Sequence, residues 1–151
     1  MAGQITIRAA KPADRQSLIE LMRRASLANP EDRDALLAHP EVIDIPVSHL
    51  SPAATCVAEL DGVPAGFATV LPRDDGDAEL DGLFVAPHLW RSGVGRALVA
   101  RSAELARLIG ARHLHVIANG AALDFYHAVG FTDFGSAQTQ FGPAITMRMP
   151  L

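Results

Sequence analysis

Apolar positions near the start of the chain change from a period of two to a helical period. Residues 4–9 alternate between apolar and polar side chains, which predicts a strand with Ile5 and Ile7 on one face. Residues 15–26 repeat at helical spacing, after a proline and an acidic residue that favour a helix start. The apolar side of this helix is predicted to consist of Leu18, Leu21, Met22 and Ala25. A strand therefore leads into an amphipathic helix, which Asn29-Pro30 ends.

Three strand patterns follow in the middle of the chain. Residues 55–60 and 65–71 are apolar runs joined through Asp61-Gly62, a pair typical of a tight hairpin turn. A polar loop over residues 73–77 leads to a third run at residues 78–85. This order predicts an antiparallel meander.

The C-terminal half alternates helix and strand patterns. Residues 91–109 carry the clearest helical period and residues 121–129 a shorter one, ended by Gly110 and Gly130. The inward face of the long helix is predicted to hold Val94, Ala97, Leu98, Leu105, Leu108 and Ile109. Further strands are predicted at residues 113–117, 131–134 and 144–149. The fold class is thus α/β, layered as α+β: a mixed, mostly antiparallel sheet of about seven strands, with about four helices over both faces.

Composition narrows the class of protein and partner. With 151 residues, 49% of them hydrophobic and 20% charged, the chain is expected to form one globular domain over residues 1–151. A net charge of −4 argues against nucleic acid as the main partner, and no apolar run approaches the roughly 20 residues of a membrane span. Cys56 is the only cysteine, which excludes an internal disulfide or a cysteine cluster for zinc, and the histidines show no metal-ligand spacing. We expect a cytoplasmic protein without a metal ion.

The most informative segment is a glycine-rich turn between a predicted strand and the long helix. It reads Leu-Phe-Val-Ala-Pro-His-Leu-Trp-Arg-Ser-Gly-Val-Gly-Arg-Ala-Leu over residues 83–98. Helix N-termini bind anions through unpaired N–H groups, and Gly93 and Gly95 permit close approach of a pyrophosphate. A dinucleotide fingerprint is excluded because Leu98 replaces its third glycine and no acidic residue ends a following parallel strand. A P-loop is excluded because no Gly-Lys-Ser/Thr is present.

Two motifs resemble those of the GNAT (Gcn5-related N-acetyltransferase) superfamily. Residues 83–87, followed by Arg91-Ser-Gly-Val-Gly-Arg-Ala, are similar to the family's Leu-x-Val-x-Pro and Arg/Gln-x-x-Gly-x-Gly/Ala patterns. Residues 119–131 resemble its Asn-x-x-Ala-x-x-Phe-Tyr-x-x-x-Gly-Phe block. With the order of strands and helices, the resemblance covers essentially the whole chain and implies a GNAT-type fold, acetyl-CoA as cosubstrate and transfer to a primary amine of a small molecule or peptide. The cofactor-binding residues that it implies are Leu83, Phe84, Val85, Arg91, Ser92, Gly93, Val94, Gly95, Arg96, Asn119, Ala122 and Phe125.

The resemblance also implies a role for each group around the reacting thioester. The N–H groups of residues 91–96 would hold the pyrophosphate, and the main chain of Phe84 and Val85 would pair with the pantetheine arm like an added strand. A backbone N–H of the same strand end would meet the thioester oxygen. Asn119 would hydrogen-bond the pantetheine arm, and Tyr126 would protonate the leaving thiolate as general acid.

Two routes are open for removing the proton that the acceptor amine loses: a general base or a relay through water. Glu79 and Asp81 share one face of their strand by its period of two, so they would point toward the cleft as general bases. They are equally consistent with solvated carboxylates, in which case water relays the proton. Together with Asp74, Asp75 and Asp77 they form an acidic cluster that predicts a preference for cationic amines.

The identity of the acceptor stays open. Specificity is expected in residues 30–54, where a short helix is predicted at 31–38, and in loops near residues 134–143. Residues 42–50 have no clean period and are consistent with a plain connection or a pocket wall. A non-catalytic acyl-CoA-binding sensor or interaction module is the alternative function, although such a binder needs no hydroxyl near the sulfur. A homodimer is expected from the frequency of symmetric oligomers.

Overall fold

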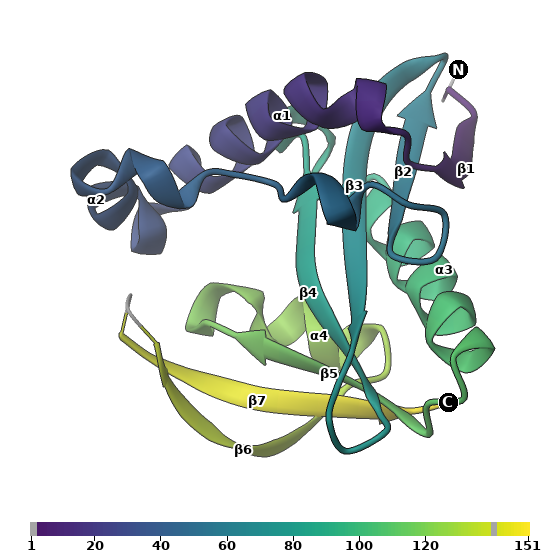
Figure 1. Cartoon of the computed structure of the whole chain (residues 1–151). Helices are drawn as coiled ribbons and strands as arrows, with labels where there is room; N and C mark the ends of the chain where they lie inside the picture. The colour runs from purple at the N-terminus through teal and green to yellow at the C-terminus, as the bar shows by residue number, and fades with distance from the viewer. Residues whose placement is uncertain (1–2, 140–141) are drawn as a thin grey trace.

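A seven-stranded sheet with helices on both faces organises the computed structural model, which describes residues 3–139 and 142–151 (Figure 1). The strands are β1 (Ile5–Ala9), β2 (Thr55–Leu60), β3 (Val63–Pro72), β4 (Ala78–Val85), β5 (His113–Ala118), β6 (Thr132–Thr139) and β7 (Gly142–Pro150). The α-helices are α1 (Arg15–Leu27), α2 (Pro30–Ala38), α3 (Val94–Leu108) and α4 (Leu123–Ala128). Short 3-10 turns connect them: η1 (Pro12–Asp14), η2 (Pro40–Val42), η3 (Val47–His49), η4 (Pro87–Leu89) and η5 (Gly120–Ala122). The predicted fold class is confirmed.

The sheet divides into two parts between β4 and β5. The strands lie in the order β1-β2-β3-β4-β5-β7-β6, and all neighbours are antiparallel except β4 and β5. That parallel pair joins only Ala78 to Leu114 and Glu79 to His115. Figure 1 shows β5 and β7 running across the lower ends of the other strands. Beyond Glu79, β4 therefore continues to Val85 without pairing to β5.

The hairpin between β2 and β3 has the turn that its sequence predicts. Asp61 and Gly62 both have positive φ angles, 52° and 81°. Two such residues match the right-handed twist of the flanking strands, which is why Asp-Gly is common there. The predicted meander of β2, β3 and β4 follows from this turn and is confirmed.

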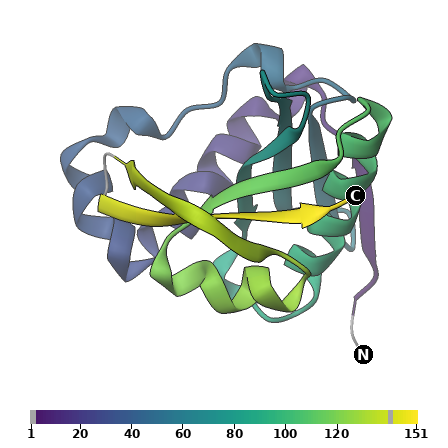
Figure 2. The same cartoon turned by 90° about the horizontal axis from the view of Figure 1, so that it is seen from below.

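Each face of the β1–β4 part buries its own apolar core. On one face α3 packs over β2 and β3, with Leu98, Val94 and Ala106 fully buried. On the other face Leu18 and Leu21 of α1 pack against Val57, together with residues of the 42–50 segment. Figure 2 shows α1 and α3 on opposite sides of these strands. The segment without a clean period is thus a packed connection, held by Ile43, Ile45 and Leu50.

Three sequence-based expectations about elements are wrong. The long helix begins at Val94 instead of residue 91, because Gly93 adopts a left-handed conformation and caps it. Leu108 is 82% exposed because it lies about 120° around the helix from the buried Ser102, and Ile109, 45% exposed, follows the last helical residue. The expected loop near residues 134–143 is instead formed by β6 and β7, apart from residues 140–141, which lie outside the described residues.

No helix among the described residues combines the length and the apolar content needed to cross a membrane.

Candidate functional site

The turn before α3 presents a helix N-terminus in an unusual backbone conformation. Arg91 has a φ angle of 65° and Gly93, the N-cap residue, one of 95°. Left-handed residues at such a turn bring successive N–H groups to one side, which creates an anion-binding concavity. A Cβ atom added to Gly93 would meet nothing within 4 Å, so the space beside the N-cap is open. This turn can hold a pyrophosphate.

Fewer backbone N–H groups are available there than the sequence predicts. The N–H of Ser92 donates to the carbonyl of Leu89 at 3.3 Å, and the Ser92 hydroxyl donates to the same oxygen. Both donors of Ser92 are therefore directed to the turn itself, and the contact of its N–H with the cofactor stays a prediction. The first four N–H groups of a helix have no partner within it, and here they belong to residues 93–96.

Gly95 has a second role that the sequence pattern does not show. A Cβ atom at this position would lie 3.1 Å from two ring carbons of Phe125. Because the glycine lets α3 approach the Phe125 ring, it serves helix packing as well as the space near the turn. Phe125 thus lies directly behind the turn, as a packing residue of the site.

The edge of β4 that faces away from β3 carries unpaired main-chain groups. Val85 opposes Gly66, and the next residue, Ala86, donates its N–H to the carbonyl of Ala65 at 2.9 Å. In an antiparallel ladder this makes Val85 a non-hydrogen-bonded position toward β3. Its own N–H and C=O therefore point to the side where β4 and β5 diverge.

The main chain of Phe84 faces the other way. Phe84 opposes Phe67, and by the alternation of the ladder its N–H and C=O belong to the β3–β4 pairing. Its ring packs against Phe67, with 5.3 Å between centroids. The expectation that the Phe84 main chain pairs with pantetheine is wrong, and Leu83 and Val85 carry the outward groups instead.

Trp90 modifies this strand edge, and no pattern in the sequence indicates it. Its indole Nε1 donates a hydrogen bond of 2.8 Å to the Val85 carbonyl. The carbonyl is thus occupied from within the protein. The Val85 N–H is the group of this residue that stays available for a ligand.

The side-chain oxygen of Asn119 is a buried hydrogen-bond acceptor. It follows β5 directly, and its Oδ1 atom is buried without a hydrogen-bond partner among the described residues. A buried acceptor left in this state costs about 1–3 kcal/mol, which a ligand N–H would relieve. With the open helix N-terminus and the β4 edge, it makes a set of residues that fits acetyl-CoA, whose pantetheine arm carries amide N–H groups.

Tyr126 lies within an aromatic cluster of the core. Its ring is 5.2 Å from that of Phe125 and 5.3 Å from that of Phe131, both in edge-on geometry. Burial raises the pKa of the Tyr126 phenol well above its usual value of about 10. The phenol therefore stays protonated, as a proton donor must, while its ring also contributes to packing. Ala122 is partly buried against the same core.

The two expected bases are not equivalent in the structure. Asp81 is the extra residue of a β-bulge, because Thr69 pairs with Gly82 while Val70 pairs with Leu80. The bulge interrupts the period of two on which the shared face was inferred. Glu79 accepts a hydrogen bond from Arg73 at 3.3 Å, whereas the exposed Asp81 has no such partner among the described side chains.

Three of the five carboxylates in the acidic cluster before β4 have hydrogen-bond or ion-pair partners, namely Asp75, Asp77 and Glu79. Asp77 accepts N–H bonds of 3.1 Å from Arg112 and His113, and its other oxygen lies 2.9 Å from His115 Nε2. The His115 hydrogen bond above all lowers the pKa of Asp77 to about 2. Asp75 pairs with Arg73 at 3.1 Å. Asp77 thereby connects the β3–β4 turn to β5, and the preference of the acidic cluster for cationic amines stays a prediction.

Asp75, Asp77 and His115 also lie close enough to share a cation, their ligand atoms being within 4.8 Å of one another. Both Asp77 oxygens already accept hydrogen bonds, and Asp75 is paired with Arg73. These three residues are therefore explained by their hydrogen bonds and ion pairs, which connect the β3–β4 turn to β5.

Comparisons with known proteins agree with this geometry. The model of the Acetyltransferase (GNAT) family matches residues 16–131. The chain belongs to the GNAT acetyltransferase family. No curated protein matches the sequence.

Several solved structures are similar to this GNAT protein. Nourseothricin acetyltransferase is 33% identical over 64% of this chain, with a TM-score of 0.59, and the match spans 64% of that protein, less than two thirds of its length. A GCN5-related N-acetyltransferase from Rhodopseudomonas palustris is 23% identical, with 100% and 98% of the two chains covered and a TM-score of 0.77. The yncA protein of Salmonella typhimurium, solved with its cofactor acetyl-CoA, is 26% identical over 98% and 94% of the chains, with a TM-score of 0.72. The family match and the yncA protein support acetyl transfer with acetyl-CoA as the cosubstrate, and the Rhodopseudomonas palustris structure shows the fold.

Proposed function

We propose that this GNAT protein is an N-acetyltransferase that moves the acetyl group of acetyl-CoA to a primary amine of a small molecule or peptide. The observation that carries the proposal is the buried Oδ1 of Asn119, which lacks a partner at the end of β5. It follows the strand that diverges from β4, whose outward edge at Val85 leads into the open N-terminus of α3. A pantetheine arm needs partners such as the Asn119 oxygen and the edge of β4. A pyrophosphate needs the helix N-terminus that follows this edge along the chain.

Each residue has a distinct part in the proposed reaction. Acetyl-CoA supplies the acetyl thioester when it is bound. The Val85 N–H donates to the thioester oxygen, where negative charge grows as the amine nitrogen attacks the carbonyl carbon. The Tyr126 hydroxyl gives its proton to the sulfur as the carbon–sulfur bond breaks, and the amine proton leaves through water. Glu79 is a weaker candidate than water for accepting the amine proton, because its carboxylate is paired with Arg73.

The alternative, a non-catalytic acyl-CoA-binding module, is favoured by one observation. Tyr126 packs between Phe125 and Phe131, so packing alone would explain its presence. Release of free thiol from acetyl-CoA separates the two functions, because a binder releases none beyond spontaneous hydrolysis.

The test is an acceptor screen that follows thiol release at saturating acetyl-CoA. The panel contains polyamines, amino acids, aminoglycosides and peptide N-termini, each measured with and without the protein. We expect at least one amine to give release proportional to protein concentration, with acetylated amine formed in equal amount. Saturable CoA binding without release on any amine would contradict catalysis and support the binding module.

A further inference from the structure

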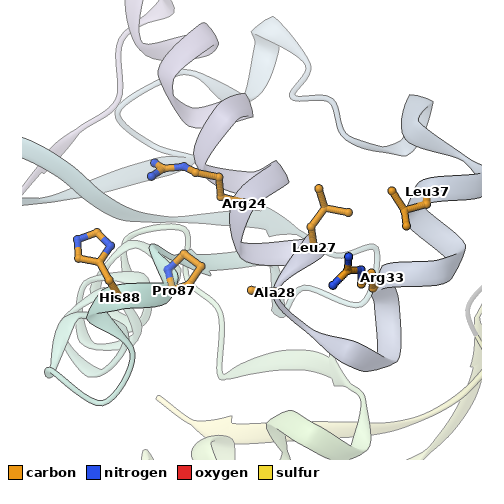
Figure 3. Close-up of a pocket in the computed structure, with 7 residues that line it drawn as sticks. All are labelled: Arg24, Leu27, Ala28, Arg33, Leu37, Pro87 and His88. Carbon is orange, nitrogen blue, oxygen red and sulfur yellow. The ribbon is translucent and has the colours of Figure 1, made fainter.

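A groove lies between the α1–α2 corner and η4. Its volume is about 540 Å³, and Figure 3 shows its lining: Arg24, Leu27, Ala28, Arg33, Leu37, Pro87 and His88. Leu27 and Ala28 lie between the two arginines in this view, and His88 stands at the end of the groove where Arg24 points. The groove thus combines apolar surface with two arginine side chains, Arg24 and Arg33.

The two arginines have no carboxylate partner among the described side chains. Arg23, the neighbour of Arg24 on α1, pairs with Glu20 at 2.7 Å. Arg24 and Arg33 form no ion pair with the part of the chain that the structure describes, and none of the described residues that line the groove is acidic. In a chain with a net charge of −4, this concentration of unneutralised positive charge favours an anionic ligand.

The groove also lies next to the proposed reaction site. Pro87 and His88, which line it, follow Val85 by two and three residues. Even a fully extended chain of three residues spans only about 10 Å, and Pro87 and His88 lie in the tighter 3-10 turn η4. A small molecule anchored by an anionic group in the groove can therefore extend an amine toward the outward edge of β4.

We propose that this groove binds the carboxylate of the acceptor, so that the acceptor is an amino-carboxylate with an apolar side chain. Guanidinium groups bind carboxylates through two parallel hydrogen bonds, and Leu27 and Leu37 offer apolar surface to the side chain. The inference rests on the proposed function and names a different acceptor class from the cationic amines that the acidic cluster favours. A phosphate of CoA has the same anionic chemistry, so the test distinguishes these two sources.

Binding is measured first, because it does not depend on turnover. The probe is N-acetyl-leucine, which carries the carboxylate, the apolar side chain and the transferred acetyl group, and N-acetyl-leucinamide is its uncharged control. We expect saturable binding of the acid in ligand-observed NMR, weakened roughly tenfold or more by Arg24→Gln or Arg33→Gln. Arg23→Gln, the same change one residue away and outside the groove, keeps wild-type affinity. Equal binding of acid and amide, or no binding of the acid to a folded wild-type protein, overturns the proposal.

Kinetic measurements then show whether the groove binds the carboxylate of the acceptor or a phosphate of CoA. The ratio of kcat/KM for leucine to that for leucinamide is compared between variants, so that the different basicities of the two amines cancel. We expect Arg24→Gln and Arg33→Gln to lower this ratio roughly tenfold or more and to leave the KM of acetyl-CoA unchanged. If both variants instead raise the KM of acetyl-CoA but not that of acetyl-dephospho-CoA, the groove binds a CoA phosphate and the proposal is wrong. Absence of thiol release on every amine contradicts the proposed function, whereas release without a carboxylate preference contradicts only this inference.

Discussion

Tyr126 couples packing to the proposed proton transfer, and the Tyr126→Phe variant separates the two. The ring and its contacts with Phe125 and Phe131 stay, and only the hydroxyl is lost. We expect kcat to fall by about 10²–10³-fold, the lower half of the usual range for general acids, with acetyl-CoA affinity nearly intact. A melting temperature below that of the wild type, with unchanged turnover, would instead make the hydroxyl purely structural.

The raised pKa of the buried Tyr126 phenol also predicts how the stability of the protein changes at alkaline pH. The folded protein holds the phenolic proton more tightly than the unfolded chain does, so this contribution to stability is complete below about pH 10 and decreases above it. Chemical unfolding from pH 9 to 11 should therefore show a steeper loss of stability in the wild type than in Tyr126→Phe. Parallel curves would contradict the burial of the phenol.

Asp77 is expected to stabilise the protein in the opposite pH range. Its pKa of about 2 lies below the value of an unfolded aspartate, so its contribution is present above about pH 4 and is lost as the pH falls toward 2. Asp77→Ala removes the acceptor for the N–H groups of Arg112 and His113 and the partner of His115. Its melting temperature should lie below the wild type at pH 7, and the gap should narrow between pH 4 and 2. A constant gap would show that ionisation of this carboxylate does not matter.

Single residues divide into those whose role follows from local pattern and those that need tertiary contacts. The hairpin glycine Gly62 and the capping glycine Gly93 occupy positive-φ positions that a local motif specifies. The hydrogen bond of Trp90 to Val85 depends on the three-dimensional path of the turn between them, and the unpartnered oxygen of Asn119 depends on how distant segments pack around it. No periodicity along the chain contains that information.

At the scale of elements, the packing of α3 against α4 accounts for Gly95. A side chain there would press on the Phe125 ring, so we expect Gly95→Val to cost about 1–3 kcal/mol in the free energy of unfolding. The measurement is urea unfolding of both single variants and of the double variant with Phe125→Ala. The valine should cost less in the Phe125→Ala background, because the ring that it meets is gone. Additive costs would contradict direct contact between these helices at Gly95.

The order and type of elements could be predicted from the sequence, whereas the register within them could not. Alternation and helical spacing place the strands and α-helices of the described residues apart from the second half of β6, as the turn at Asp61-Gly62 and the stop at Gly110 illustrate. The bulge at Asp81 escapes such reasoning, because it arises from how β4 is paired with β3. That single extra residue decides which side of the strand each later side chain faces, and it undermined the predicted pair of bases.

At the scale of the whole molecule, the separation of the sheet into two parts creates the proposed site. β4 and β5 pair at only two positions, which leaves the far edge of β4 without a strand partner on that side. The N-terminus of α3 follows this edge, and Asn119 follows β5. A single extended ligand with an anionic end is what this arrangement would hold, and it involves segments more than 30 residues apart in sequence.

The central claim is that acetyl-CoA binds through the turn at Gly93, and calorimetric titration with CoA tests it most directly. Gly93 and Gly110 lie just before and just after α3, have φ angles of 95° and 82°, and would both carry a Cβ that meets nothing within 4 Å. Alanine should therefore cost a similar amount of stability, about 1–2 kcal/mol, at either end of the helix. We predict that Gly93→Ala weakens CoA binding roughly tenfold or more, because it disturbs the N–H groups that hold the pyrophosphate, whereas Gly110→Ala keeps wild-type affinity. Equal CoA affinity in the two folded variants would contradict the account.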